Sequence, residues 1–504
     1  MTLKRFSLCL LLFSVVLSHC PSSKVNAYEP DWKSLQEYDI PDWMADAKFG
    51  IFIHWGPSCV PGYRTDWYPR WMYQDKVQWN HRTGEIQAHR PHPAYLYHVK
   101  TYGAPSQFGY KNFFPLFKAE EFDAEAWVDL FVKSGAKYVI PVAEHHDSYA
   151  MYASKFTRWN SVDTGPQRDI LGELRTEIKK QKLIFGVSSH LAFNWDFYNQ
   201  QPHFDTGDPN YADLYAPQHE PYSNTSAEFL KTWWLRTKDI IDNYEPDILW
   251  FDFGIDRAEW APYHARLAAY YYNSGLKRGV TPVLQTKNLS YDSYPAGTHM
   301  LDLERSKSDQ MLDELWQTDT SVGINSWFYC REWVSKSSNL LIDDLIDIVS
   351  KNGCLLLNIG PDASGRIPAD QANVLLEIGE WLQVNGEAVY GTRPWHVYGE
   401  GPTQVATGHL SEDKNQKFNS QDIRFTQKGD TVYAIILQAP EGKTLIHSLN
   451  ASTHEELKNI KSISVLGSER TLDWAMTDQG LQIGRIETPP FESAVVLKID
   501  CQQL

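Results

Sequence analysis

Eight short apolar segments lie between residues 48 and 360, and no other property of the chain restricts its fold so strongly. Several are apolar at almost every position, as parallel strands buried on both faces are. Helical patterns with one apolar stripe, such as 122–136, 168–181 and 339–353, fall between them. This alternation predicts a (β/α)8 barrel that is irregular between residues 256 and 320, where the helical pattern is weak. The eight segments are 48–55, 137–146, 183–190, 247–254, 282–288, 300–305, 316–321 and 354–360.

The pattern changes near residue 395, where apolar and polar residues begin to alternate. Lys428-Gly429-Asp430 marks a hairpin turn between two such runs. A chain of 504 residues is also too long for one compact core. We therefore predict an α/β barrel domain over residues 28–392 and a C-terminal antiparallel β-sandwich over residues 393–504. The sandwich could bind sugar, close the active site or simply cover the barrel.

The N-terminus has the parts of a secretory signal. Lys4 and Arg5 form a positive region, residues 6–17 form an apolar segment too short to span a membrane, and residues 25–27 suit cleavage before Tyr28. No other segment is long and apolar enough to cross a membrane. We predict that residues 1–27 are a signal peptide. The mature protein is then secreted or periplasmic, or lysosomal if the host is an animal. Export permits disulfides, and the remaining cysteines allow none, one or two: Cys59, Cys330, Cys354 and Cys501.

Charge and aromatic content narrow the range of partners. The formal net charge is −16. A surface this acidic repels phosphate backbones, which argues against nucleic acid as a partner. The chain also holds 19 Trp, 27 Tyr and 22 Phe residues, more rings than a core usually needs. Some of them are expected to line a cleft where a flat apolar face meets a polar ligand such as a sugar.

Polar or ionisable side chains end nearly every predicted strand. Barrel enzymes carry their reactive groups at the C-terminal ends of the strands, so these side chains are expected to converge on one site. Asp252 is the most unusual of them, because it interrupts the apolar run DILWFDFGID (247–256). A lone carboxylate in such surroundings costs several kcal/mol unless it is paired, hydrogen-bonded or protonated. The strand-end residues are His54, Glu144, His145, His146, Asp147, Ser189, His190, Asp252, Asn288, Glu304, Thr318 and Asp319.

Two kinds of chemistry fit this set. Histidines with an aspartate could hold zinc. However, His145 and His146 are adjacent, and adjacent side chains on a strand point to opposite faces, so we expect no metal. Retaining glycoside hydrolysis instead needs an ionised carboxylate as nucleophile and a protonated one as general acid, roughly 5–5.5 Å apart. Histidine and tryptophan neighbours suit a sugar, because imidazoles bond its hydroxyls and rings cover its apolar face.

Five sequence blocks sharpen this choice. They are KFGIFIHWGPSCVPGYRTDWYPRWMY (48–73), EHHDSYAMY (144–152), ILWFDFG (248–254), WQTDTSVGINSW (316–327) and LLLNIGPDASGRIP (355–368). Together, and in this order, they resemble the retaining α-L-fucosidases of glycoside hydrolase family 29 over the whole chain after the signal peptide. The resemblance implies an exo-acting hydrolase without a cofactor. It would remove terminal α-L-fucose from oligosaccharides or glycoconjugates through a covalent fucosyl-enzyme intermediate.

The resemblance also implies roles for single residues. Family members carry the nucleophile as the Asp of a Trp-x-Asp at the end of a barrel strand, which is Asp252 here. Its burial among imidazoles is then explained, because it attacks the anomeric carbon. Trp250 is expected to form the floor of the pocket. The methyl group of fucose needs an apolar contact, for which Phe52, Phe253 and Trp327 are candidates. The implied sugar-binding residues are His54, Trp67, His145, His146 and His190.

The general acid is placed less directly, because its position varies within the family. We predict Glu304, which lies at a predicted strand end in LDLERSKSD. Asp302 and Glu259 are the neighbouring alternatives. A structural ion pair with Arg305 is the other role open to Glu304.

Two further points stay open at this stage. Family members often continue the histidine pair as His-His-Asp-Gly-Phe, but this chain has Ser148 and Tyr149 in the last two places, so the shape of the pocket there is uncertain. Two other functions also fit the scaffold, a non-catalytic carbohydrate-binding protein and a metal-dependent barrel hydrolase. Binding alone gives no reason to bury Asp252, and stoichiometric zinc or manganese would favour the hydrolase.

Overall fold

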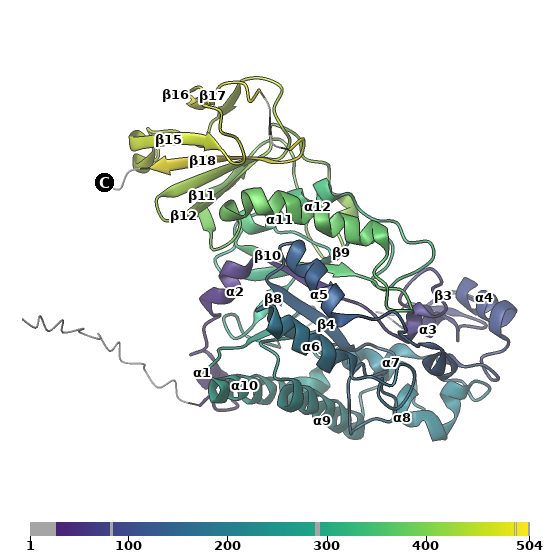
Figure 1. The fold of residues 1–504 in the computed structure, drawn as a ribbon. Helices are drawn as coiled ribbons and strands as arrows, with labels where there is room; N and C mark the ends of the chain where they lie inside the picture. The colour runs from purple at the N-terminus through teal and green to yellow at the C-terminus, as the bar shows by residue number, and fades with distance from the viewer. Residues whose placement is uncertain (1–26, 81–83, 288–292, 488, 490, 502–504) are drawn as a thin grey trace, which may run out of the picture.

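The fold is built around a closed barrel. The computed structural model describes residues 27–80, 84–287, 293–487, 489 and 491–501, so the predicted signal peptide, apart from Ala27, lies outside the described residues. Within them, eight parallel strands close in the order β1-β10-β9-β8-β7-β6-β5-β4 (Figure 1). Each strand coincides with a predicted apolar segment to within one residue at its start, and the predicted barrel is confirmed. The strands are β1 (Phe49–Ile53), β4 (Tyr138–Glu144), β5 (Ile184–Ser189), β6 (Ile248–Phe251), β7 (Val283–Thr286), β8 (Met300–Asp302), β9 (Trp316–Ser321) and β10 (Gly353–Ile359).

Most of the barrel strands are apolar on both faces, because each face packs against a different layer. Phe52 and Trp250 belong to a small cluster of buried side chains contributed mainly by the strands. Their neighbours Ile51 and Leu249 join the main core, which also contains the helical side chains. Since successive side chains on a strand point to opposite faces, the first cluster fills the barrel interior and the second lies under the helices.

The predicted helices are confirmed and carry the expected signals at their ends. Asp123 caps α5 by accepting a hydrogen bond from the backbone N–H of Ala126 at 3.1 Å, and the rings of Phe122 and Trp127 pack with centroids 4.8 Å apart. Just beyond α5, Gly135 has a φ of +87°, which favours glycine. The long helices are α5 (Ala124–Lys133), α6 (Ile170–Lys180), α9 (Ala227–Tyr244), α10 (Ala261–Arg278), α11 (Ser338–Ser350) and α12 (Ala369–Asn385).

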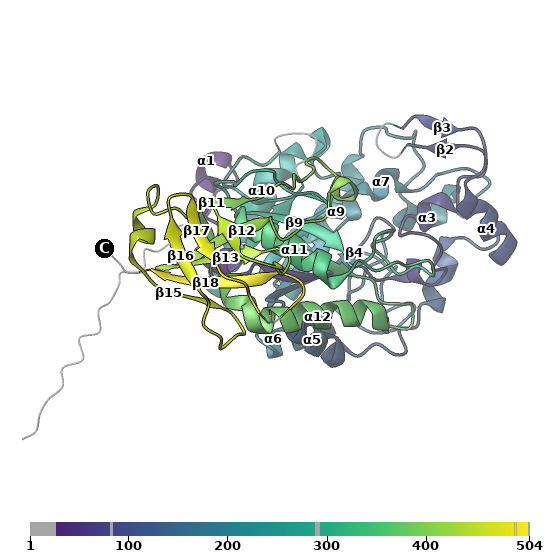
Figure 2. The same ribbon diagram turned by 90° about the horizontal axis from the view of Figure 1, so that it is seen from above.

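The irregular part of the barrel lies where it was predicted. In the described residues, no helix separates β7 from β8 or β8 from β9. The chain instead makes long excursions after β1 and β5, and the first of these lies at the far end of the molecule from the sandwich (Figures 1 and 2). Their elements are α3 (Tyr68–Trp71), β2 (Gln78–Trp79), β3 (Ile86–Ala88), α4 (Pro93–Tyr102), α7 (Asn194–Phe197) and α8 (Ala212–Tyr215), while α1 (Trp32–Leu35) and α2 (Asp42–Ala47) precede the barrel.

The C-terminal part is the predicted antiparallel sandwich. A five-stranded sheet has the order β11-β12-β13-β18-β15, and a three-stranded sheet has the order β14-β17-β16. Gly429, with a φ of +57°, makes the predicted hairpin turn between β12 and β13. The strands are β11 (Arg393–Glu400), β12 (Ile423–Lys428), β13 (Thr431–Ile436), β14 (Thr444–Ile446), β15 (Ile460–Val465), β16 (Trp474–Thr477), β17 (Gly480–Ile483) and β18 (Val495–Cys501).

The sandwich packs against α11 and α12 of the barrel (Figure 1). Tyr433 and Val496 of the sandwich belong to the same buried cluster as the barrel helices. Trp381 of α12 donates a hydrogen bond from Nε1 to the carbonyl oxygen of Ala494 at 2.9 Å. One apolar core therefore extends from the barrel helices to one face of the sandwich, while the sandwich also encloses a separate cluster of its own.

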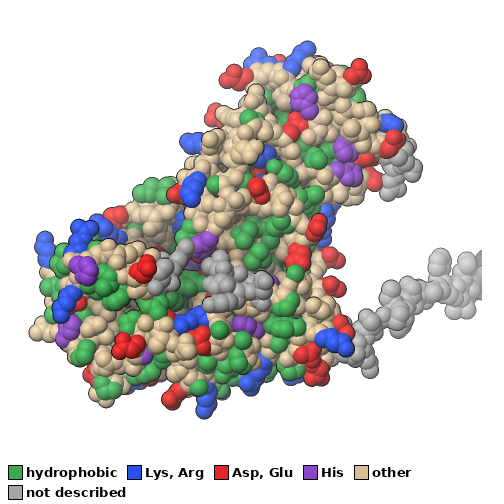
Figure 3. Space-filling model, turned by 180° about the vertical axis from the view of Figure 1, so that it is seen from behind, with side chains coloured by type: hydrophobic (Ala, Val, Ile, Leu, Met, Phe, Trp, Pro, Cys, Tyr) green, Lys and Arg blue, Asp and Glu red, His purple; other side chains and the backbone are tan. Residues whose placement is uncertain are grey.

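The structure bears on membrane spans, surface charge and disulfides. No helix in the described part of the chain has both the length and the apolar character needed to cross a bilayer. Acidic and basic side chains are interspersed over the face shown in Figure 3. Four of the cysteines lie in the described residues, where all are buried and form no disulfide: Cys59, Cys330, Cys354 and Cys501.

Candidate active site

A pocket of about 840 Å³ lies at the C-terminal ends of the barrel strands. Side chains that end or follow β1, β4, β5, β6, β7, β8 and β9 line it. The structure brings together nine residues predicted from the sequence, namely His54, Trp67, His145, His146, His190, Trp250, Asp252, Glu304 and Trp327. Among the other predicted strand-end residues, Asp319 also lines the pocket, whereas Glu144, Asp147, Ser189 and Thr318 do not.

Asp252 lies directly after β6 and is 6% exposed. Its Oδ2 atom accepts a hydrogen bond from His190 Nδ1 at 3.0 Å and lies 3.2 Å from His146 Nε2, while Lys287 Nζ lies 2.8 Å from Oδ1. Burial raises the pKa of the Asp252 carboxyl, but Lys287 and the two histidines outweigh burial and hold that pKa well below its usual range. The side chain is therefore a buried, ionised carboxylate, as a nucleophile requires.

Lys287 is the central cation of the site, and the sequence interpretation missed it. Its Nζ atom lies 2.8 Å from Asp252 Oδ1, 2.7 Å from Glu304 Oε2 and 3.9 Å from Asp319 Oδ2. Burial lowers the pKa of the Lys287 ammonium, but the surrounding carboxylates raise it well above its ordinary value. The sequence analysis names the next residue, Asn288, as the polar end of this strand, and Asn288 lies outside the described residues. A signal for Lys287 was available in the sequence. The lysine follows a buried strand, and acids follow several of the other strands, so it could have been expected to pair with them.

The shared lysine also fixes how far apart the two predicted catalytic carboxylates can be. Asp252 Oδ1 and Glu304 Oε2 each contact the same Nζ atom, so they are separated by no more than the sum of the two contacts, 5.5 Å. Retaining glycosidases hold their two carboxyl groups about 5–5.5 Å apart, whereas inverting enzymes hold them about 6.5–9.5 Å apart. The upper limit of 5.5 Å fits the retaining arrangement.

The histidines form a largely neutral lining. Burial is the largest cause that places the pKa values of His54 and His145 well below normal and that of His190 at about 4. Asn358 of β10 fixes the first ring, because its Oδ1 accepts from both the backbone N–H and Nδ1 of His54, at 3.1 and 2.7 Å. A neutral imidazole offers one donor and one acceptor, which suits hydrogen bonding to sugar hydroxyls.

The expectation from strand alternation is wrong for His145 and His146. β4 ends at Glu144, so both histidines lie beyond the strand and both line the pocket. The ligand atoms of His54, His145 and His190 lie within 4.8 Å of one another, as do those of His146, His190 and Asp252. Geometry alone therefore permits a metal at either set. In the second set, however, the Lys287 ammonium already neutralises Asp252 and would repel another cation. A third set, His396, His454 and Glu456, lies in the sandwich.

Aromatic rings form the rest of the lining. Trp250 is fully buried below the pocket, with its ring 5.0 Å from Lys287 Nζ, as the predicted floor should be. Trp67 and Phe253 lie nearly parallel with centroids 6.5 Å apart, and Trp327 lies 5.2 Å from the His54 ring. Phe52 is not a lining residue, because it is buried against Trp250. Phe253 and Trp327 remain as contacts for a methyl group.

The alternatives for the general acid separate clearly. Glu304 lines the pocket, whereas neither Asp302 nor Glu259 does. Asp302 is fully buried and accepts a hydrogen bond from Gln317 Nε2 at 2.6 Å, and Glu259 lies beside Arg257 and the backbone of Thr225. Arg305 does not pair with Glu304, because its carboxylate partner is Glu412 of the C-terminal domain.

The unusual Ser148 and Tyr149 leave the pocket unobstructed. Neither lines it. Ser148 has a φ of +67°, a left-handed conformation in which glycine is the easy choice. Arg236 stabilises the serine by donating to its Oγ at 2.9 Å and to its carbonyl oxygen at 3.0 Å. The phenol of Tyr149 is directed elsewhere and donates to the carbonyl oxygen of Thr164 at 2.9 Å.

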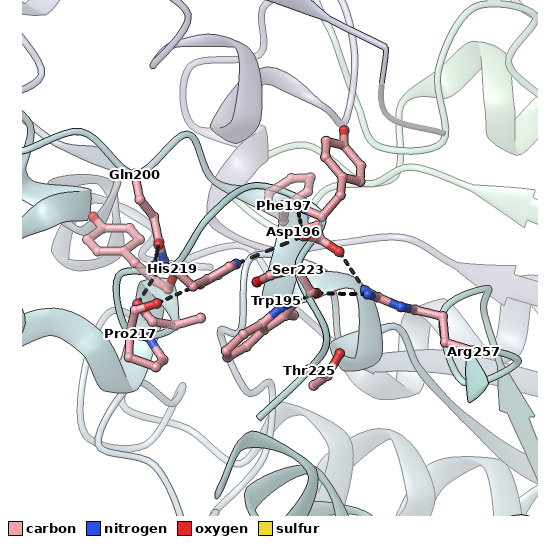
Figure 4. Close-up of polar contacts among 12 residues, drawn as sticks. Trp195, Asp196, Phe197, Gln200, Pro217, His219, Ser223, Thr225 and Arg257 are labelled. Atoms are coloured by element: carbon pink, nitrogen blue, oxygen red, sulfur yellow. Dashed lines mark hydrogen bonds and ion pairs between the residues drawn. The ribbon is translucent and has the colours of Figure 1, made fainter. Parts of the chain in front are cut away.

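The loops after β5 and β6 extend the pocket beyond the catalytic groups. Asp196, Tyr222 and Arg257 line it. Figure 4 shows the Arg257 guanidinium between the Asp196 carboxylate, 2.5 Å away, and the carbonyl oxygen of Ser223, 3.1 Å away. The His219 ring stacks on Trp195 with centroids 3.9 Å apart. These contacts fix segment 217–225 against α7 and give the pocket a firm outer wall.

The last part of the lining comes from the C-terminal domain. His409, Leu410, Glu412 and Asp413 lie in the segment between β11 and β12, and all four line the pocket. Closure of the active site was one of three roles left open for the sandwich, but no sequence signal had singled out these residues. They lie in a polar connection without the alternation or helical period that identifies an element.

Comparisons with known proteins identify the family of the chain. Residues 15–387 match the family model of α-L-fucosidase, and residues 415–500 match that of the α-L-fucosidase C-terminal domain. The tissue α-L-fucosidase of Homo sapiens is 30% identical over 469 residues, covering 92% of this chain and 89% of the relative. The crystal structure of Thermotoga maritima α-fucosidase in complex with fucose matches with a TM-score of 0.70 and 30% identity, over 94% of this chain and 100% of that one. Because the first family model alone spans well over half of the sequence, the chain belongs to the α-L-fucosidases, the glycoside hydrolases of family 29.

Proposed function

We propose that this chain is an exported exo-α-L-fucosidase that releases terminal α-L-fucose with retention of configuration. Asp252 is the nucleophile that forms the covalent fucosyl intermediate, and Glu304 is the acid and base. One observation carries the proposal: both carboxylates contact Lys287 and lie no more than 5.5 Å apart in a pocket lined by histidines and aromatic rings. The reaction belongs to the barrel, residues 28–392, and requires no cofactor.

The geometry supports two steps with opposite roles for Glu304. In the first, Asp252 attacks the anomeric carbon while Glu304 donates a proton to the departing glycosidic oxygen. In the second, Glu304 removes a proton from the water that attacks the intermediate. The general acid must carry a proton when the leaving oxygen departs. The contact between Lys287 and Glu304 therefore has to open when substrate binds, whereas its contact with Asp252 keeps the nucleophile ionised.

The lining supports recognition of one terminal deoxyhexose. His54, His145, His146 and His190 offer ring nitrogens to its hydroxyls, and Trp67 offers an aromatic face. Phe253 and Trp327 are the apolar contacts for its methyl group. Trp250 and the filled barrel interior close the pocket from below, so only the end of a glycan fits. The Thermotoga maritima neighbour is described as a complex with fucose and as a complex with a mechanism-based inhibitor, which supports fucose as the sugar that this chain recognises.

The size of the pocket supports a fucosylated oligosaccharide or glycoconjugate as substrate. Its volume of about 840 Å³ lies in the upper part of the range for pockets that hold drug-sized ligands. The wall formed by Asp196, Tyr222 and Arg257 lies on loops and is the proposed contact for the sugar that leaves.

The proposed export rests on the signal-like sequence of residues 1–27, and the fold is compatible with cleavage before Tyr28. Tyr28 is anchored to α10, since its backbone N–H donates to Asn273 Oδ1 and its carbonyl oxygen accepts from Asn273 Nδ2, both at 2.8 Å. Cleavage after Ala27 would leave this anchor intact. N-terminal sequencing of the mature protein should begin at Tyr28, and retention of the residues before it would contradict the proposal.

A covalent trap tests the central step. We expect 2-deoxy-2-fluoro-fucosyl fluoride to label the wild-type protein once, and peptide mass spectrometry to place the label on Asp252. NMR should show α-fucose as the first product. With azide, Asp252→Gly should give β-fucosyl azide and Glu304→Ala should give the α-anomer. A label on another side chain, or β-fucose as the first product of the wild type, would refute the proposal.

A further inference from the structure

The C-terminal domain reaches into the active site through the segment between β11 and β12, residues 401–422, here called the β11–β12 loop. The backbone N–H of Leu410 donates to the carbonyl oxygen of Glu304 at 3.1 Å, and that of Glu412 donates to the carbonyl oxygen of Arg305 at 2.9 Å. The loop therefore holds the main chain of the proposed acid and of the residue after it. In the described residues, no helix lies between β8 and β9 that could support this backbone instead.

The backbone at this point needs outside support. Arg305 has a φ of +42°, and a side chain larger than glycine in this left-handed region is strained by about 1–2 kcal/mol. A strained residue persists only where surrounding contacts hold it in place. The hydrogen bond from Glu412 is such a contact, and it acts one residue from the Glu304 carboxylate.

The Glu412 side chain ties the same point to the rest of the barrel. Its Oε1 lies 2.5 Å from Arg305 Nη1, and its Oε2 lies 2.9 Å from Lys336 Nζ and 2.5 Å from Thr320 Oγ1. Burial raises the pKa of Glu412, but Lys336 and Arg305 outweigh burial and hold that pKa below normal. The carboxylate is thus an ionised crosslink between the loop, the end of β8 and β9.

Glu412 is the carboxylate among the groups that hold the Arg305 guanidinium. The guanidinium donates to the carbonyl oxygens of Gly323 and Ile324 and covers the Trp327 ring at 4.5 Å. Without Glu412, Arg305 would lose its carboxylate partner, and Glu304 is its immediate neighbour in the sequence. A guanidinium beside a carboxylate favours its ionised form, which cannot donate a proton.

We propose that Glu412 is a positioning residue for Glu304, and that the C-terminal domain thereby forms a working part of the active site. This inference depends on the proposed function, because it takes Glu304 as the acid. It assigns the sandwich a role beyond covering the barrel: its loop holds the acid in place and keeps the neighbouring cation away from it.

Leaving-group dependence tests the proposal. Fluoride and dinitrophenolate depart without a proton, whereas the alkoxide of a sugar needs one. We expect Glu412→Gln to lower kcat/KM about 10- to 100-fold on a fucosylated disaccharide, a part of the 10²–10⁴-fold that general acid catalysis supplies. On 2,4-dinitrophenyl α-fucoside or fucosyl fluoride the loss should stay within about threefold. An equal loss on both classes, or no loss on either, would overturn the proposal.

Three further variants complete the design. Glu400→Gln removes a charge just before the same loop, where the carboxylate accepts from the backbone of His447 and Ser448, and it should leave both substrate classes unaffected. Glu412→Asp keeps the charge and should show the same selectivity with a smaller loss, which covers the case that Glu412→Gln does not fold. Glu304→Gln is the benchmark. If it shows no leaving-group selectivity, the acid assignment itself fails, whatever Glu412 does.

Discussion

Two clusters of buried charge lie in this molecule, one at the end of the barrel strands and one between barrel and sandwich, and they are compensated differently. The first, the site cluster, consists of Asp252, Lys287, Asp302, Glu304 and Asp319. The second, the interface cluster, consists of Lys307, Asp343, Asp344, Asp347, Lys351 and Arg424.

In the interface cluster, Asp344 and Asp347 each have at least one cation of their own. Asp344 pairs with Lys307, and Asp347 lies 2.8 Å from Lys351 Nζ and 2.6 Å from Arg424 Nε. Arg424 belongs to β12, so this cluster joins the sandwich to α11. A buried ion pair seldom adds much stability compared with an apolar pair, but the loss of one partner leaves an uncompensated charge. The cluster therefore fixes how the two domains dock.

In the site cluster, three carboxylates share one cation. Lys287 contacts Asp252 and Glu304 closely and Asp319 at 3.9 Å. Burial, and then the neighbouring Asp302, raise the pKa of Asp319 well above normal, so the surplus of acids is relieved by protonation. The interface cluster joins two domains through acids that have their own cations. The site cluster has more acids than cations, so its acids differ in protonation state, and they face a pocket. Burial of charge alone would not distinguish the two.

Replacement of Asp252 should have the largest effect and act on catalysis alone. Asp252→Ala removes the nucleophile, and we expect kcat on an aryl α-fucoside to fall on the order of 10⁴-fold or more. The thermal midpoint should change little, because Asp319 and Glu304 remain near Lys287. The matched control is Asp242→Asn on the exposed side of α9, which should retain full activity. Near-normal turnover by Asp252→Ala would show that the site cluster is not catalytic in the proposed way.

Replacement of Asp347 should have the opposite profile. Asp347→Ala leaves Lys351 and Arg424 buried without their carboxylate, and we expect a loss of about 3–5 kcal/mol in the free energy of unfolding. At a temperature where the variant is folded, kcat should stay within a few-fold of the wild type. Urea denaturation and a fucoside assay measure the two effects. A stable Asp347→Ala variant with low activity would contradict the view that the interface cluster serves stability and the site cluster serves catalysis.

The sequence predicted the barrel well because strands buried on both faces leave an apolar signature, and it predicted the site because polar residues end those strands. It failed where the answer depends on contacts through space. Glu412 lies in a polar connection and Lys287 directly follows a buried strand, and for both residues only folding reveals the partners. The expectation that His145 and His146 diverge failed because β4 stops one residue before the pair.

Replacement of Lys287 should change the pH dependence of the reaction. The lysine lowers the pKa of Asp252, so Lys287→Met should raise it, and the acidic limb of the kcat/KM profile should move to higher pH by about 1–3 units. Lys111→Met is a suitable control, because Lys111 also pairs with a buried carboxylate, Asp205, but outside the pocket. Its acidic limb should not move. An unmoved limb in Lys287→Met would mean that another group sets it.

An effect on stability that appears only as pH rises is expected at Asp343, the interface acid without a cation of its own. Burial, and then Asp344, raise the pKa of Asp343 to about 8. Between the ordinary value for an aspartate and pH 8, the folded protein therefore holds a proton that the unfolded chain has released. Stability contributed by that proton is present at low pH and is lost as pH rises toward 8.

Asp343→Asn keeps the shape without the proton. At about 1.4 kcal/mol for each unit of the rise in pKa, its stability should exceed that of the wild type at pH 8 by about 5 kcal/mol and match it near pH 4. Urea midpoints between pH 4 and 8.5 measure this difference. Glu380→Gln on the exposed face of α12 should follow the wild-type curve throughout. A constant difference between Asp343→Asn and the wild type at all pH values would mean that Asp343 is ionised and compensated like its neighbours. The interface would then consist of matched charges only, and the protonated acids would be confined to the active site.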